Sequence, residues 1–288
     1  MSVALITCQR FAKLPSDERL LVDALAQRGV AAFPRVWSDR SDDWDHIELA
    51  VLRSCWDYHE KPRRFRSWVK LTSRVTRVFN PPELILWNMH KEYLAELAAA
   101  GIPIVPTILV RMGQSASVDD LRRKLLTEEF VIKPAVSASA SRTTVIGRGH
   151  VPFDSAQRDL DDLLRDQDAL VQPFLREIYD LQERSLIFID GAFSHAVKRP
   201  PLSTGAAGGD SRESLIDPSA EEIALANRVL AVAPSETLYA RVDLIPRYDG
   251  SFALAELEVI EPALYLGHHA PSVAKLADAI ISKLENRS

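Results

Sequence analysis

Two short charged segments stand out near residue 250. Arg241 and Asp243 lie in one apolar run typical of a β-strand, Glu256 and Glu258 lie in the next, and the turn residues Asp249-Gly250 separate the two runs. Because residues two apart in a strand point to the same face, a hairpin would bring the three carboxylates together. Carboxylates held close together repel one another unless cations lie between them, and their hard oxygen atoms suit Mg²⁺. The alternative is a charged strand face in contact with water.

Two lysines further upstream could bind an anion. Lys91 lies on an expected helix, and Lys133 ends an apolar strand directly before the small-residue run Ala135–Ser141. A lysine at a strand end beside a flexible loop can meet phosphate oxygens, while backbone N–H groups of the loop approach the same anion. Ser137 and Ser139 are the polar residues of this loop that we expect at the phosphates. A polar surface turn is the alternative interpretation.

A third segment could hold a nucleotide base. Gln172, Pro173 and Phe174 follow an apolar strand and lead into a polar stretch that ends at Glu183. Backbone groups at such a strand end can bond the edge of adenine while apolar side chains cover its faces. A carboxylate such as Glu183 can accept the ribose hydroxyls.

The elements that must position these residues fall into three successive units. In residues 1–87 short apolar strands alternate with helices, which predicts a small parallel sheet. Helices and strands alternate again in residues 88–175, whereas residues 176–288 hold longer strands joined by tight turns, which predicts antiparallel neighbours. The fold class is therefore α/β, with α+β character in the last unit. The expected strands are residues 3–6, 30–33, 49–52, 75–79, 130–133, 143–147, 169–171, 186–189, 192–198, 239–247 and 251–260, and the expected helices include 63–73, 88–100, 119–126, 155–165, 220–232 and 272–285.

Composition narrows the class of protein. The 288 residues are 47% hydrophobic and 26% charged, which excludes a fibrous or disordered chain. The formal net charge of −5 comes from interspersed acids and bases, so neither a nucleic-acid nor a membrane surface is indicated. Two cysteines are too few for a disulfide framework, and no apolar run reaches the roughly 20 residues of a membrane span. We therefore expect a cytoplasmic protein that acts on a small molecule, with self-association into a homo-oligomer left open.

In chain order, these residues resemble the pattern of the ATP-grasp superfamily, and the resemblance covers nearly the whole chain. It implies an ATP-grasp fold in which a small N-terminal lobe precedes two lobes that hold ATP between their sheets. It also implies ATP and Mg²⁺ as cofactors, with Mn²⁺ as an alternative metal. By position, it assigns Lys91 and Lys133 to the phosphates, Gln172, Pro173 and Phe174 to adenine, Glu183 to the ribose, Asp243, Glu256 and Glu258 to Mg²⁺, and Arg241 to the transferred phosphoryl group.

Two stretches are most similar to the O-ureido-serine cyclo-ligase subgroup of cycloserine biosynthesis. They are residues 53–58 and 256–262, and in the second the chain has Glu-x-Glu where the superfamily usually has Glu-x-Asn. The first stretch follows an expected parallel strand, at the end where open α/β sheets bind ligands. We therefore predict that an amino-acid-like substrate is held here, although a packed structural loop is the alternative. The predicted substrate residues are Arg53, Ser54, Asp57 and Tyr58.

A second basic segment could complete the site. Lys198 and Arg199 end an expected strand beside the loop Gly205–Gly209, and Arg212 follows that loop. We predict Lys198 as a catalytic residue at the phosphates and Arg199 as a substrate residue, while a charged hairpin end is the ordinary alternative. His268 and His269 could exchange protons near neutral pH, but an adjacent pair at a helix start is more often structural.

The resemblance implies an ADP-forming ligase that makes a C–N bond. ATP would phosphorylate a carboxyl-like group of an amino-acid-derived substrate, and a nitrogen would then attack the activated carbonyl. Ring closure within one substrate would serve antibiotic biosynthesis, whereas joining of two substrates would make an amide or dipeptide. A small-molecule kinase and a non-catalytic ATP-binding module are further alternatives.

Overall fold

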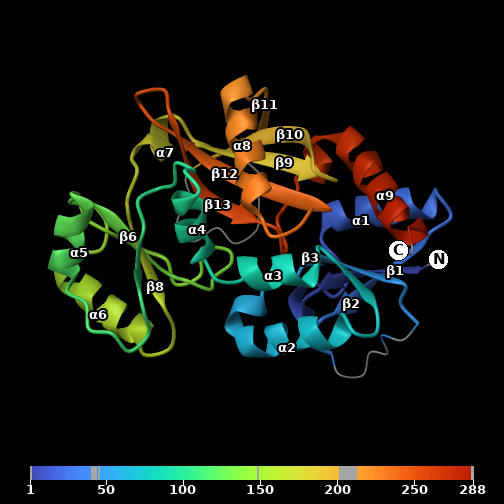
Figure 1. Cartoon of the computed structure of the whole chain (residues 1–288), viewed down its shortest axis with the longest axis horizontal. Coiled ribbons are helices and arrows are strands. Elements are labelled where there is room, and N and C mark those ends of the chain that lie inside the picture. The colour runs from blue at the N-terminus through green and yellow to red at the C-terminus, as the bar shows by residue number, and fades with distance from the viewer. Residues whose placement is uncertain (1, 40–43, 45, 148, 201–212, 287–288) are drawn as a thin grey trace.

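The computed structural model describes the chain except residues 1, 40–43, 45, 148, 201–212 and 287–288. The described residues form three β-sheets that follow one another along the chain (Figure 1). The predicted Gly205–Gly209 loop and Arg212 lie outside the described residues. The predicted unit boundaries after residues 87 and 175 stay a prediction, because helices from one unit pack on the sheet of another.

The N-terminal sheet is parallel throughout, as the sequence predicted. All six residues of its third strand are buried, which fits a central parallel strand with both faces covered. Its strands, in spatial order, are β2 (Ala31–Val36), β1 (Ser2–Thr7), β3 (Leu49–Ser54) and β4 (Arg77–Phe79), and the helices are α1 (Ser16–Ala26) and α2 (Pro62–Thr72), with short turns η1 (Gln9–Phe11) and η2 (Tyr58–Glu60).

The central sheet is antiparallel and covered by helices on one face. Phe130 and Ile132 enter the core beneath those helices, so Val131 and Lys133 point to the opposite face. In Figure 1 this part of the chain forms the green and yellow-green end of the molecule. The strands, in spatial order, are β5 (Ile108–Val110), β8 (Ala169–Pro173), β6 (Phe130–Pro134) and β7 (Thr144–Ile146), and the helices are α5 (Val118–Leu125) and α6 (Phe153–Leu164).

The C-terminal sheet is antiparallel, and its two predicted hairpins are confirmed. Asp190 and Gly191 both have positive φ, as a tight hairpin turn requires, and Asp249-Gly250 joins the second pair of strands. The strands, in spatial order, are β11 (Ser214–Ile216), β10 (Ala192–Arg199), β9 (Glu183–Ile189), β12 (Tyr239–Pro246) and β13 (Phe252–Glu258), and the accompanying helical segments are α7 (Glu177–Asp180), α8 (Ala220–Val232), η3 (Leu266–His268) and α9 (Ala270–Glu285).

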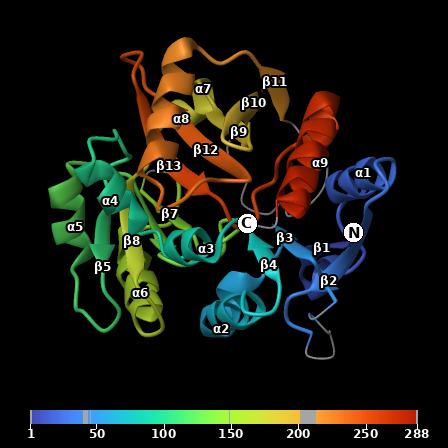
Figure 2. The ribbon, with the colours of Figure 1, turned by 45° about the vertical axis from the view of Figure 1, so that its right-hand side comes forward.

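The two faces of the C-terminal sheet have different environments. Leu186, Val242 and Leu257 point into a core shared with α8. On the other face, Ile187 and Tyr239 enter a core shared with α9 and α1, which lie side by side in Figure 2. Only part of that second face is apolar, and the remainder carries the charged residues described below.

The helix expected over residues 88–100 is wrong, because two short helices occupy this region. They are α3 (Pro82–Asn88) and α4 (Tyr93–Ala99), and Lys91 lies in the turn between them. The Asn88 side chain donates to the carbonyl of Leu257 at 2.8 Å and accepts from the N–H of Val259 at 3.2 Å. Asn88 therefore ends one helix and bonds the edge of β13, instead of capping the start of a longer helix.

Side chains satisfy the outer edge of β13, which has no strand beyond it in its sheet. The Tyr93 hydroxyl donates to the carbonyl of Leu257 and accepts from its N–H, both at 3.0 Å, and Asn80 Nδ2 donates to the carbonyl of Val259 at 2.6 Å. Buried backbone groups must find partners, and here amide and phenol groups replace a neighbouring strand. This arrangement fixes the direction in which β13 presents its acids.

Among the described helices, none combines the length and the apolar character that crossing a bilayer requires.

The substitution Asn88→Ala should destabilise the protein. It removes one donor and one acceptor from buried backbone groups of β13, which should lower the free energy of unfolding by about 1–3 kcal/mol. Urea denaturation monitored by circular dichroism measures this change. Asn227→Ala, on an exposed position of α8, is the control. Equal midpoints for the two variants would contradict the proposed edge contact.

Candidate active site

Strand register gathers the predicted charged residues on one face of the C-terminal sheet. Arg241 lies opposite Glu258, and Asp243 lies opposite Glu256, across β12 and β13. Directly opposite residues of an antiparallel pair share a face, so the geometry matches the convergence that the sequence predicted. We call this surface the polar face, and it comprises Glu183, Ser185, Arg199, Arg241, Asp243, Glu256 and Glu258.

Asp243 is the most buried acid of the polar face, with 1% of its surface exposed. Arg241 Nε donates to Asp243 Oδ1 at 2.9 Å, and Arg199 Nη2 donates to Oδ2 at 3.0 Å. The Ser185 hydroxyl also donates to Oδ1, at 2.6 Å. Burial opposes ionisation of this carboxyl, but the neighbouring Arg199 and Arg241 outweigh it and lower the pKa of Asp243. Asp243 is therefore charged at neutral pH, with both oxygens bonded.

Glu256 and Glu258 are more open than Asp243. Their side chains are 26% and 27% exposed, respectively. Lys91 Nζ lies 2.9 Å from Glu256 Oε1, and Arg241 Nη2 donates to Glu258 Oε1. Burial opposes ionisation of Glu256, but Lys91 and Lys133 lower its pKa. Burial, reinforced by Glu256 and Asp243 and only partly offset by Arg241, raises the pKa of Glu258 to about 7.

Positively charged side chains of the protein already offset the repulsion between these carboxylates. Within the part of the chain that the structure describes, no three His, Cys, Asp or Glu side chains form a ready metal-binding group. Mg²⁺ needs only one or two protein carboxylates when phosphate oxygens and water complete its shell. Glu256 and Glu258 each use one oxygen in an ion pair and stay partly exposed, so their donors fit this ion better than those of Asp243. The Mg²⁺ role of all three acids stays a prediction.

Two lysines face the acids of the polar face. Lys91 is 5% exposed, and its Nζ also donates to the carbonyl of Ser137 at 2.8 Å. Lys133 is half-buried on the face of β6 that points away from α5 and α6. Burial lowers the pKa of Lys133, and the nearby Glu256 partly offsets that effect. The positive charges of both amines therefore stabilise the ionised form of Glu256. This agrees with the sequence-based expectation that the two lysines face the acids.

The small-residue loop has an unusual backbone for its sequence. Ser139 and Ala140 have φ values of 51° and 53°, in the left-handed region that favours glycine. Lys91 bonds the Ser137 carbonyl, and the Ser137 hydroxyl donates to the Pro134 carbonyl at 3.2 Å. The loop is thus tied to the same lysine that reaches Glu256. Phosphate contacts by Ser137 and Ser139 stay a prediction.

The segment predicted to hold the nucleotide base and ribose is held by hydrogen bonds and an ion pair to other parts of the protein. Gln172 Nε2 donates to the hydroxyl of Thr107 at 2.8 Å, and the N–H of Phe174 donates to the carbonyl of Glu129, also at 2.8 Å. Glu183 Oε2 lies 2.8 Å from Arg199 Nη2, at the end of the polar face. The adenine role of residues 172–174 and the ribose role of Glu183 stay predictions.

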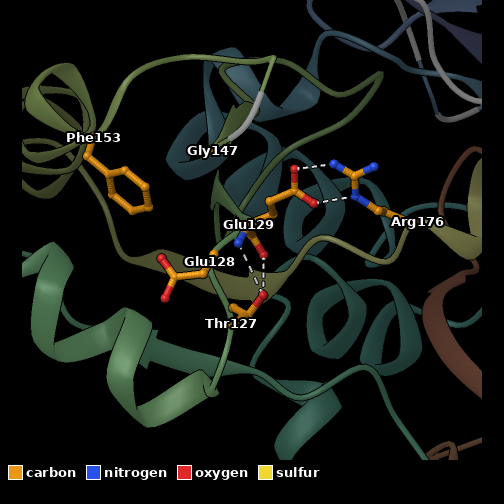
Figure 3. A pocket seen from close by; sticks show the side chains of 6 residues that line it. All are labelled: Thr127, Glu128, Glu129, Gly147, Phe153 and Arg176. Atoms are coloured by element: carbon orange, nitrogen blue, oxygen red, sulfur yellow. Dashed lines mark hydrogen bonds and ion pairs between the residues drawn. The ribbon is translucent and has the colours of Figure 1, made fainter.

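A pocket of about 680 Å³ opens at the other end of β6 (Figure 3). A bidentate ion pair from Arg176 to Glu129 crosses it, with N–O distances of 2.5 and 2.7 Å. Glu129 precedes β6, whereas Lys133 lies near the end of that strand, so the pocket lies apart from the polar face. A Cβ at Gly147 would come within 2.8 Å of the Glu128 carbonyl, so only glycine fits there. The remaining lining residues are Thr127 and Phe153.

Arg53 and Ser54 contact other protein groups in this structure, and their role at the substrate stays a prediction. Arg53 is 0% exposed, and its Nε and Nη2 donate to the two carboxylate oxygens of Glu18 at 3.0 Å. Its Nη2 also donates to the carbonyl of Pro262 at 3.1 Å. The buried Ser54 hydroxyl donates to that of Thr7 at 2.8 Å. Arg53 thus joins β3 to α1 and to the segment after β13, whereas Ser54 links β3 to β1 within the N-terminal sheet.

Asp57 and Tyr58 differ from each other in placement. Asp57 Oδ1 accepts from Trp37 Nε1 at 2.6 Å, a contact within the N-terminal unit. Tyr58 is buried against the ring of Phe65. Burial, followed by the charges of Glu261 and Glu256, raises the pKa of Tyr58 well above its usual range. Among the four predicted substrate residues in this stretch, Tyr58 has a pKa that is raised by acids in and just after β13.

Strand alternation separates Lys198 from Arg199, and the catalytic role of Lys198 stays a prediction. Lys198 is exposed and pairs with Arg184 on β9, so it points to the face opposite the polar face. Arg199 points to the polar face and contacts both Glu183 and Asp243. The substrate role of Arg199 stays a prediction, although in this structure its partners are protein carboxylates.

His269, which follows β13, is packed against another histidine. His269 stacks on His195 with ring centroids 4.6 Å apart, and a His195 ring nitrogen lies 3.0 Å from the carbonyl of Leu264. Burial and the neighbouring His269 lower the pKa of His195 to about 4. His269 therefore packs on a buried histidine, and a proton-transfer role for His268 or His269 stays a prediction.

Sequence reasoning missed several residues around the site. Asn80, Asn88 and Tyr93 hold the edge of β13, and nothing local in the sequence indicates partners more than 150 residues away. The charge of Glu261 raises the pKa of Tyr58, and the charge of Glu258 raises the pKa of Glu261. A signal for Glu261 was available, because it is the third acid in the spacing Glu256-x-Glu258-x-x-Glu261.

Comparisons with known proteins agree with this architecture. Residues 3–80 match a family model described as the N-terminal domain of D-cycloserine synthetase DcsG. The chain is 29% identical over 298 residues to the cycloserine biosynthesis protein DcsG of Streptomyces lavendulae, covering 98% of this chain and 99% of that protein. The crystal structure of D-cycloserine synthetase DcsG matches with a TM-score of 0.90 at 28% identity, covering 99% of this chain and all of the other.

More distant structures share the fold alone. D-alanine–D-alanine ligase from Bacillus anthracis, complexed with ATP, matches with a TM-score of 0.69 at 18% identity, over 99% of this chain and 97% of that chain. The ATP-grasp ligase PsnB, complexed with a phosphomimetic precursor variant, Mg and ADP, matches at 0.68 and 16%, over 98% of both chains. The chain therefore has the ATP-grasp fold. Within that class, the chain is similar along nearly its whole length to D-cycloserine synthetase DcsG.

Replacing Arg199 should affect stability far more than replacing Lys198. Arg199→Ala leaves buried carboxylates with one cation fewer, which should cost about 3 kcal/mol, whereas the exposed Lys198→Ala should change stability by about 0.5 kcal/mol or less. Parallel urea titrations of the two variants compare them directly. A larger loss for Lys198→Ala would show that the assignment of these side chains to the two faces is wrong.

His195 should make the protein less stable in acid. An unfolded histidine titrates near pH 6.5, and the native group near pH 4, so the unfolded chain binds an extra proton between these values. Stability therefore falls as the pH falls through this window, by about 2 kcal/mol at pH 4.5. His195→Gln should show a correspondingly smaller loss between pH 7 and pH 4.5 in thermal melts. The exposed His150→Gln serves as control and should keep the full loss.

Proposed function

We propose that this chain uses ATP and Mg²⁺ to activate the carboxyl group of a small amino acid related to O-ureido-serine and closes it into a ring. The observation that carries the proposal is the polar face, on which Lys91 and Lys133 meet the acids of β12 and β13. It is supported by the match to a cycloserine synthetase along the whole chain. A cytoplasmic location, where ATP is available, is part of the same proposal.

The residues of the polar face suit phosphoryl transfer to a carboxylate. The carboxylate oxygen of the substrate attacks the γ-phosphorus of ATP, the bond to the bridging oxygen breaks, and ADP leaves with the electron pair. Lys91, Lys133 and Arg241 are placed to offset the negative charge of the phosphates and the acyl phosphate. Mg²⁺, held by Glu256 and Glu258, would neutralise further phosphate charge, and Mn²⁺ has the same ligand preference.

Ring formation then needs only a nucleophile within the substrate. A nitrogen near the other end of the activated amino acid attacks the acyl carbon, the C–O bond to phosphate breaks, and inorganic phosphate leaves. A solvent base can accept the proton of that nitrogen, so no nucleophilic side chain is required. An intramolecular attack gains from proximity because both groups belong to one bound molecule.

The proposal predicts turnover that depends on the substrate and on Glu256. The purified chain with ATP, Mg²⁺ and O-ureido-serine should release ADP and phosphate, and mass spectrometry should detect a cyclised product. Glu256→Gln removes the partner of Lys91 and a predicted Mg²⁺ ligand, and should lower kcat about 10²-fold or more. Glu236→Gln, at an exposed position, is the matched control and should leave turnover unchanged.

Other products would identify other functions. A stable phosphorylated amino acid without phosphate release would indicate a kinase, and a product that contains a second amino acid would indicate joining of two substrates. Hydroxylamine would trap an acyl phosphate as a hydroxamate. Absence of ADP release with every amino acid tested would contradict the proposal.

A further inference from the structure

Glu261 is an exception among the buried acids of the described chain. Four others each have a cationic partner: Glu18 pairs with Arg53, Glu177 with Arg247, Glu222 with Arg184, and Asp243 with Arg199 and Arg241. Glu261 is 7% exposed, yet no hydrogen bond or ion pair reaches its carboxylate from any residue that the structure describes. A buried carboxylate without a partner is costly, and such groups require an explanation.

Backbone contacts place Glu261 at the junction of the N-terminal unit and β13. Trp56 Nε1 donates to the Glu261 carbonyl at 2.9 Å, and Arg53 bonds the carbonyl of the next residue, Pro262. Arg53 lies near the end of β3, and Trp56 lies in the loop after that strand, which continues into Tyr58. Glu261 is therefore fixed against the stretch that the sequence predicted for the substrate, three residues beyond Glu258.

Tyr58 gives this junction a second unused polar group. It is 4% exposed, and its hydroxyl makes no hydrogen bond with another described residue. Burial, and then the charge of Glu258, raises the pKa of Glu261 well above its usual range, although Lys91 lowers it in part. Glu261 is also the strongest charged influence on the Tyr58 hydroxyl after burial. The two groups thus share a buried, electronegative environment, and no described residue forms an ion pair with the Glu261 carboxylate.

We propose that Glu261, together with the Tyr58 oxygen, binds the ammonium group of the amino-acid substrate. An ammonium group has one positive charge and three donors, which complements one carboxylate and one phenol oxygen. In an α-amino acid the ammonium lies two bonds from the carboxyl carbon, so a site beside the polar face is where it should lie when the carboxyl faces Lys91 and Arg241. This inference rests on the proposed ligase function and names the residues that select an amino acid.

The test compares O-ureido-serine with 3-(ureidooxy)propanoic acid, which is the same molecule without its amino group. The wild-type protein should prefer the amino acid by at least about 100-fold in kcat/KM, because its buried carboxylate would otherwise stay unpaired. Glu261→Gln keeps the shape of the side chain and should reduce this preference at least about 10-fold, with KM for the amino acid raised and KM for ATP unchanged. A purely structural role would lower turnover of both compounds equally.

Two further variants complete the experiment. Tyr58→Phe keeps the ring packed against Phe65 and should also raise KM for the amino acid, while the exposed Glu236→Gln should change neither preference nor KM. Thermal shift by a non-hydrolysable ATP analogue with Mg²⁺ should be the same in all variants, which shows that each retains a folded nucleotide site.

The outcomes separate the two proposals. Wild-type turnover with an unchanged amino-acid preference in Glu261→Gln would overturn the ammonium site and leave the ligase function intact. Absence of ADP release from the wild-type protein with either compound would instead overturn the ligase proposal on which the site rests.

Discussion

The ion pairs of Arg241 are the interaction on which the polar face depends. One guanidinium contacts Asp243 on its own strand and Glu258 on the next, and it also bonds the carbonyl of Ala263 beyond β13. Three acids from two adjacent strands could not stay ionised in a poorly solvated place without such cations, because each carboxylate raises the pKa of the others. Lys91 extends the same balance to Glu256, and this lysine comes from the turn between α3 and α4. Charge compensation therefore ties the turn between α3 and α4 to the C-terminal sheet.

A second constraint is the uncovered edge of β13. In a regular sheet the outward N–H and C=O groups would bond another strand or water, whereas here Asn80, Asn88 and Tyr93 supply the partners. These side chains come from α3, α4 and the segment before them, so the position of the helices and the direction of Glu256 and Glu258 are set by the same bonds. A substitution that changes how these helices pack at this edge therefore also changes the direction of Glu256 and Glu258.

One face of the C-terminal sheet is divided along its length into an apolar half and a polar half. Ile187, Val197 and Tyr239 pack against α9 and α1, while Arg199 and Arg241, each two residues further along its strand, carry charge on the same face. The apolar half anchors the sheet to the N-terminal unit, and Arg53 and Trp56 reinforce that contact by bonding the chain just after β13. The polar half is thereby held beside the loop that carries Tyr58. An enzyme that must exclude water from an acyl phosphate needs such a rigid support.

Much of this protein is determined by local sequence. Alternation and turn residues were sufficient to predict the C-terminal hairpins and the shared face of Arg241, Asp243, Glu256 and Glu258, because strand geometry has a fixed period of two. Tertiary structure decided the rest. Arg53 bonds Glu18, Asn88 ends a helix to reach β13, and Lys198 is excluded from the polar face by its register with β9. The buried partners of Arg53 and Asn88 are distant in sequence, and the cost of leaving a buried polar group unpaired selects them only when the whole chain has folded, whereas strand register decides the face of Lys198.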